Sequence, residues 1–123
     1  MAKKLAFFLL STLSMISLFG QKKDNNLKHS YSFAEPENTA CIVCSHVLTK
    51  QRTILFASHD KDDGTWQFLC GQSDHTDSDA KLISLKQATG IDPSINALKL
   101  LPLGFGAERE SVKQPWTFFP MKN

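Results

Sequence analysis

The chain has 123 residues, of which 41% are hydrophobic and 21% are charged, a composition typical of one globular domain. This length excludes a TIM barrel or a two-domain dehydrogenase, because such folds need roughly 200 residues or more. The formal net charge is +2, but without Lys3 and Lys4 the chain has 12 basic and 12 acidic side chains. The neutral remainder gives no electrostatic reason to expect binding to nucleic acid or to an anionic membrane.

Residues 1–20 contain the three parts of a secretory signal. A basic pair of lysines is followed by an apolar stretch over residues 5–18, and Gly20 provides a small residue before a cut at Gln21. The apolar stretch is shorter than the ~20 residues that span a bilayer, which favours a cleaved signal over a membrane anchor. No cysteine follows it, which excludes a lipoprotein cut. We therefore expect export to the periplasm or the medium, with membrane contact only during export.

The residues after the predicted signal divide into a polar linker and a folded domain. Residues 21–37 are rich in Asn, Lys and Ser, and such a segment buries too little apolar surface to order itself. We therefore expect a polar linker over residues 21–37 and the domain over residues 38–123.

Three short apolar runs in the first half of the domain predict strands, over residues 41–48, 53–58 and 65–70. An Asp-Gly pair between the second and third runs is the signal of a tight hairpin turn. In the third run Trp66, Phe68 and Cys70 alternate with other residues, so this face should meet the core. These runs predict an antiparallel meander.

The second half predicts helices and a last strand. Residues 82–90 are typical of a short strand that continues into a helix ending at Gly90. Asp92 is typical of a helix N-cap, and the following helix should bury an apolar stripe of Ile95, Leu98 and Leu101. Residues 115–119 predict a terminal strand. The expected fold is a single α+β domain with a small antiparallel sheet (meander) and two short helices.

Cysteine and histidine provide the strongest chemical signal in the chain. Thiolate and imidazole are the ligands that zinc prefers, and a structural zinc site needs four of them in a tetrahedron. The C-x2-C spacing of the motif CIVCSH suits zinc, but a second close pair is missing. The predicted zinc ligands are Cys41, Cys44, Cys70 and His46. Zinc is the only cofactor that this pattern suggests.

Three other interpretations of the cysteines stay open. An exported protein meets an oxidising compartment, so two of Cys41, Cys44 and Cys70 are candidates for a disulfide. A bridge from Cys70 to one of the other two is easiest if the first and third strands are neighbours. Alternatively, the cysteines are buried free thiols. A redox-catalytic role would need the C-x2-C pair at a helix N-terminus, whereas here it lies in a strand-rich segment.

We expect no enzymatic activity. The chain has no G-x-S-x-G nucleophile elbow, and the neighbours Ser58, His59 and Asp60 do not form the spatially assembled arrangement of a triad. Binding of a partner protein is a better expectation, and tryptophan and arginine are enriched at the centres of such interfaces. The candidate partner-binding residues are Trp116, Arg109 and Glu108, of which the last two could form a surface ion pair.

The chain contains, in order, the segments NTACIVCSHVL, ILFASHDKDDGTWQFLCG, HTDSDAKLISLKQ, DPSINALKLLPLGFGAERE and PWTFF. In order and spacing they are similar to the domain of unknown function 2185 family, which is also grouped as immunity protein 33-like. The resemblance covers residues 37–119. It implies a small α+β domain that gives immunity against secreted bacterial toxins, and it implies no catalytic residues.

Together these observations predict an exported, small, non-catalytic binding protein, similar to immunity proteins, that acts by binding a partner protein such as a toxin. The alternative is an exported zinc-binding protein that uses the Cys/His cluster.

Overall fold

The computed structural model describes residues 30–122. The elements in chain order are β1 (Ala40–Cys44), α1 (Ser45–Leu48), β2 (Phe56–His59), β3 (Trp66–Leu69), the 3-10 helix η3 (Asp77–Asp79), β4 (Ala80–Ser84), α2 (Leu85–Ile91), the 3-10 helix η4 (Pro93–Leu98), β5 (Phe105–Glu108) and β6 (Thr117–Pro120). The predicted signal, residues 1–20, lies outside the described residues. Within residues 30–122, no helix has the length and apolar character that crossing a membrane requires.

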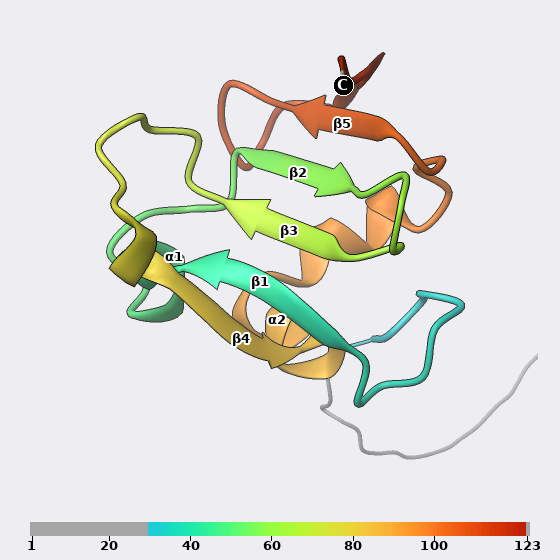
Figure 1. Ribbon diagram of the computed structural model, residues 1–123, viewed down its shortest axis with the longest axis horizontal. Coiled ribbons are helices and arrows are strands. Elements are labelled where there is room, and N and C mark those ends of the chain that lie inside the picture. Colours follow the sequence, from blue (N-terminus) through green and yellow to red (C-terminus); the bar gives the residue numbers. More distant parts are fainter. Residues whose placement is uncertain (1–29, 123) are drawn as a thin grey trace, which may run out of the picture.

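All six strands form one sheet with the order β4-β1-β3-β2-β5-β6, and α2 and η4 lie on one of its faces (Figure 1). The chain is therefore a small single domain of the α+β class, as expected. The predicted antiparallel meander is wrong, because β1 and β3 pair in parallel while the other four pairs are antiparallel. The reason is the long connection through α1, which carries the chain from β1 past the position of β3 and into β2.

The hairpin between β2 and β3 forms where the Asp-Gly pair predicts it. The backbone N–H of Asp60 donates to Thr65 O at 2.8 Å, and the N–H of Gly64 donates to Asp60 O at 3.0 Å. Gly64 has φ +75°, a conformation that glycine adopts without strain. The Asp60 carboxylate also accepts the N–H of Asp62 at 2.7 Å, so the turn is held by its own side chains.

Other predicted elements differ in extent, type or number, since the described residues form two α-helices and two 3-10 helices where two short helices were predicted. The strand predicted over residues 41–48 ends at Cys44, and α1 occupies the rest. The helix predicted after Asp92 is the 3-10 helix η4, with Asp92 as its N-cap accepting the N–H of Ser94 at 3.0 Å. The predicted stripe is buried, and its three-residue spacing matches the 3.0 residues per turn of a 3-10 helix.

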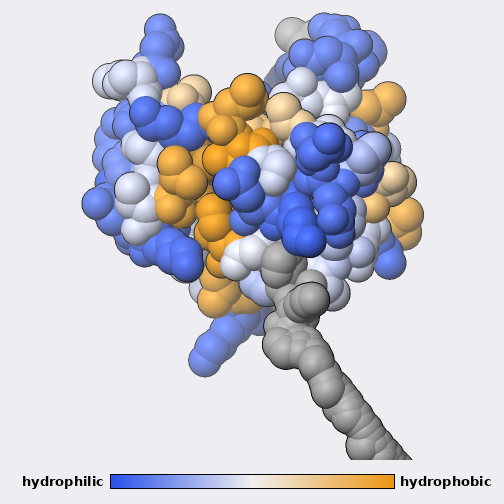
Figure 2. Space-filling view, turned by 90° about the horizontal axis from the view of Figure 1, so that it is seen from below, coloured by the Kyte–Doolittle hydropathy of each residue, from blue (hydrophilic) through white to orange (hydrophobic). Residues whose placement is uncertain are grey.

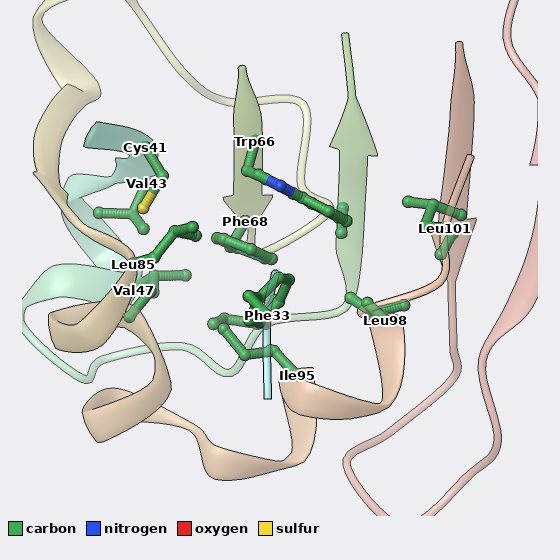
Figure 3. Packing of buried hydrophobic residues seen from close by; sticks show 14 of the residues in the cluster. Phe33, Cys41, Val43, Val47, Trp66, Phe68, Leu85, Ile95, Leu98 and Leu101 are labelled. Atoms are coloured by element: carbon green, nitrogen blue, oxygen red, sulfur yellow. The ribbon is translucent and has the colours of Figure 1, made fainter. Parts of the chain in front are cut away.

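The core lies between the sheet and the helices (Figure 3). From β3, Trp66 and Phe68 are buried together with the following Cys70, as their alternation predicts. Phe33, which precedes every strand, also enters this core. Its ring lies 5.0 Å from that of Trp66 and 6.1 Å from that of Phe68, both edge to face. The folded domain therefore includes part of residues 21–37, the segment that we expected to be a linker.

Polar contacts hold the same N-terminal segment in place. The indole N–H of Trp66 donates to Glu35 Oε2 at 2.8 Å, and the Tyr31 hydroxyl donates to Glu35 O at 2.7 Å. His59 stacks on Trp66 with ring centroids 3.9 Å apart, and its Nε2 lies 3.7 Å from the Glu35 carboxylate. The segment is thus held by the buried ring of Phe33 and by the Glu35 carboxylate, which contacts both Trp66 and His59.

We predict that Phe33→Ala lowers the free energy of unfolding by about 3–5 kcal/mol, because it leaves a cavity beside two aromatic rings. The matched control is Phe118→Ala, since Phe118 is 42% exposed. That control should cost less than about 1 kcal/mol. Urea denaturation followed by tryptophan fluorescence measures both values. Equal losses for the two variants would show that Phe33 is not part of the core.

Candidate metal centre

The parallel pairing of β1 and β3 brings two cysteines to the same edge of the sheet. Because parallel strands run in one direction, their carboxyl ends lie side by side (Figure 1). Cys44 is the last residue of β1, and Cys70 directly follows β3. The first turn after β1 is α1, which contains His46, and the loop after β3 contains His75.

The side chains of Cys44, His46, Cys70 and His75 converge at this edge. One ligand atom from each residue lies within 4.8 Å of every other. Cys70 Sγ and His75 Nε2 are 3.3 Å apart, and the ring centroids of His46 and His75 are 5.2 Å apart. Around a tetrahedral zinc ion, bond lengths of about 2.3 Å to sulfur and 2.0–2.1 Å to nitrogen place neighbouring ligand atoms roughly 3.3–3.8 Å apart. The observed cluster is therefore close to the size of a single-ion site.

The structure brings together three of the four predicted zinc ligands and replaces the fourth. Cys41 lies on β1 opposite Trp66 of β3 and Ile83 of β4, is fully buried, and does not belong to the cluster. His75 takes the place that the sequence prediction gave to Cys41. In the sequence, His75 follows Cys70 with a C-x4-H spacing, just after a predicted strand. That spacing alone does not show that the two side chains meet.

A bidentate ion pair supports the cluster from outside. Two nitrogens of Arg52 donate to the two carboxylate oxygens of Asp74, both at 2.9 Å. Arg52 Nη1 also lies 3.5 Å from Cys70 Sγ and 3.5 Å from His46 Nδ1. The hydrogen bonds from Arg52 hold the pKa of Asp74 well below its usual range. Arg52 thus places a cation beside a sulfur that would carry negative charge as a metal ligand.

A second contact ties the loop before β4 to α1. The Ser45 hydroxyl donates to Asp79 Oδ1 at 2.6 Å, and this bond lowers the pKa of Asp79. Asp79 Oδ2 accepts the backbone N–H of Thr76 at 2.8 Å, which completes a capping box at η3. Residues 70–79 are therefore anchored on both sides of His75.

All three cysteines are buried free thiols in the structure. Burial raises the pKa of Cys41 to about 12 and also raises the pKa of Cys44. Cys44 and Cys70 are the two cysteines that contribute to the cluster, so they are also the pair placed for a disulfide. This agrees with the condition that the first and third strands are neighbours.

The candidate partner-binding residues occupy different environments. Glu108 is exposed, whereas Arg109 is 8% exposed and uses its guanidinium inside the fold. Arg109 donates five hydrogen bonds, to Ile54 O twice, Asp92 Oδ2, Ser94 Oγ and Val112 O. A guanidinium has five N–H donors, so none is left for a partner. The expected ion pair with Glu108 is replaced by one with Asp92, at 2.8 Å.

Trp116 covers this buried arginine. The guanidinium carbon of Arg109 lies 4.2 Å from the Trp116 ring centroid, a cation–π contact. Among the residues that the structure describes, the indole Nε1 of Trp116 is the one buried side-chain nitrogen or oxygen without a hydrogen-bond partner. Trp116 is half-buried, because part of its side chain packs against the hydrophobic core and the rest is exposed.

Comparison with known proteins gave no match to a family model, a curated protein or a solved structure. The resemblance to immunity protein 33-like domains therefore stays a prediction, and the side-chain geometry carries the functional argument.

We predict that Arg109→Met lowers the free energy of unfolding by about 3–5 kcal/mol, because it leaves the partly buried Asp92 carboxylate and the Ile54 carbonyl without the guanidinium that pairs with them. The control is the neighbouring Glu108→Gln, which should change stability by no more than about 0.5 kcal/mol. Thermal and urea unfolding measure both variants. An Arg109→Met protein as stable as the wild type would mean that this network does not stabilise the fold.

Proposed function

We propose that this domain binds one zinc ion through Cys44, His46, Cys70 and His75. The observation that carries the proposal is the convergence of four ligand atoms, from two strand ends, a helix and a loop, within 4.8 Å. Two thiols and two imidazoles are also a donor set that zinc prefers. A zinc ion satisfies all four at once.

The donor types and their spacing favour zinc over other metals. Magnesium and calcium prefer oxygen ligands, and the cluster has none. Two cysteines and two histidines also hold the [2Fe–2S] cluster of Rieske proteins, but there the two pairs bind different iron atoms. Here Cys70 Sγ and His75 Nε2 are 3.3 Å apart, a separation that suits a sulfur and a nitrogen bound to the same ion. The arrangement therefore favours a mononuclear tetrahedral site.

The proposed ion has a structural role. Four protein ligands fill a tetrahedron and leave no position for substrate, which is the pattern of structural rather than catalytic zinc. The ion would join the end of β1 and the start of α1 to residues 70–75 after β3. A domain of this size has a thin core, so a cross-link of this kind contributes to folding directly. Arg52, fixed by Asp74, supports the Cys70 sulfur from outside.

We predict that the reduced protein binds one zinc ion per chain and that His75→Ala weakens binding more than the roughly 10- to 100-fold that loss of a supporting residue costs. Competition with a chromogenic chelator measures the affinity, and elemental analysis gives the stoichiometry. The matched control is Cys41→Ala, which removes a buried thiol outside the cluster and should retain the ion. Retention by His75→Ala with loss by Cys41→Ala would instead support the Cys3His site that the sequence predicts.

A second candidate function is binding of a partner protein, and an exposed apolar region favours it. Strand β4 is at one edge of the sheet, and its Leu82 is 72% exposed. Leu82 pairs with Ile42 of β1, which alternates with the buried Cys41 and Val43 and so faces away from the helices. Seen from the β4 side, below in Figure 1, the surface has a hydrophobic band between hydrophilic regions (Figure 2). Such patches often mark interaction sites.

If the partner is a toxin encoded beside this protein, co-expression of the two should restore growth, and Leu82→Asp should abolish the rescue by placing a charge in the contact. The matched control is Leu100→Asp, because Leu100 is 78% exposed but lies beyond η4. Colony counts with each variant measure the effect. Failure of the wild-type protein to rescue, or equal rescue by both variants, would exclude toxin binding through β4.

A further inference from the structure

A cavity of about 150 Å³ adjoins the proposed zinc site. It lies between strand residues of the sheet and the loop that carries His75, and Cys44 and His75 both form part of its wall. Gln67, Thr76 and Asp79 provide polar groups along the same wall. The rest of the wall is apolar, from Ile42, Leu69 and Ala80, and a cavity of this size admits water-sized molecules, each of which occupies roughly 30 Å³ in the liquid.

The cavity distinguishes the two cysteines of the cluster. Cys44 and Cys70 are 2% and 1% exposed, so neither is reached from the open surface. Only Cys44 lines the cavity. Cys44 is therefore the cysteine of the cluster next to a space that a small molecule can enter, whereas the Cys70 sulfur contacts Arg52 and His75.

We propose that Cys44 is a peroxide-reactive cysteine, and that its oxidation to a disulfide with Cys70 releases the bound metal ion. The inference rests on the proposed function, because coordination to zinc keeps both sulfurs as thiolates, and the thiolate is the nucleophile. The oxidant is hydrogen peroxide, which is small enough for the cavity. The two sulfurs belong to a cluster whose ligand atoms are all within 4.8 Å of one another.

The reaction has two steps and balances with two protons. The Cys44 thiolate attacks one peroxide oxygen, so that an S–O bond forms, the O–O bond breaks and hydroxide leaves. The Cys70 thiolate then attacks the Cys44 sulfur, so that the S–S bond forms, the S–O bond breaks and a second hydroxide leaves. Both hydroxides take a proton from solvent and become water. The sulfurs lose two electrons in total, and the peroxide gains them.

Oxidation removes two of the four ligands of the ion, because a disulfide sulfur does not replace a thiolate as a zinc ligand. Two of the contacts that surround the site do not involve the sulfurs. Arg52 still pairs with Asp74, and Ser45 still pairs with Asp79. The disulfide would also join the end of β1 to the end of β3, as the ion does. The fold therefore has a cross-link at this edge in both states.

The test begins with the full-length reduced protein loaded with zinc, and then adds hydrogen peroxide in the presence of a chromogenic zinc chelator. We expect loss of the one bound ion per chain, a mass about 2 Da below that of the reduced apoprotein, and a Cys44–Cys70 disulfide in peptide maps. Dimedone added at early times should label Cys44. Reduction should restore zinc binding, and Cys41→Ala should behave as the wild type.

The outcomes separate this inference from the proposed function. Failure to bind zinc at the loading step overturns the proposed function. Zinc that binds and then stays bound under peroxide overturns the inference alone. Release with sulfinic acid at Cys44, dimedone on Cys70, or a disulfide that includes Cys41 also overturns it.

Discussion

The parallel pairing of β1 and β3 is the constraint on which the rest of the structure depends. It places Cys44 and Cys70 side by side at one edge of the sheet, although many residues separate them in the chain. An antiparallel arrangement of the same two strands would put these cysteines at opposite ends. The connection through α1 makes the parallel pairing possible and also supplies His46. One feature of the topology thus creates both the sheet and the candidate metal centre.

The other side of the molecule depends on a buried cation. Arg109, at the end of β5, joins the loop before β2 to the N-cap of η4 through Ile54 O and Asp92. The N-terminal segment is attached independently, by Phe33 in the core. Three separate sets of contacts therefore hold the domain together, and these are the Phe33 ring in the core, the Arg109–Asp92 ion pair and the Cys/His cluster. Each of them joins segments that are distant in the sequence.

Local signals in the sequence predicted the local structure well. The Asp-Gly pair predicted the β2–β3 turn, Asp92 predicted a helix start, and the alternation of Trp66 and Phe68 predicted a buried face. Non-local features were beyond reach, because nothing near Cys41 indicates that its strand pairs in parallel or that its side chain enters the core. The same limit applies to the fourth cluster residue, since only the folded loop places His75 beside Cys70.

The position of Phe33 has a consequence for the order in which the protein is made. Phe33 leaves the ribosome before the strands that surround it, and its aromatic neighbours on β3 follow much later. Non-local contacts of this kind form slowly and only after most of the chain is present. The core therefore closes late, when both the first and the central segments are available.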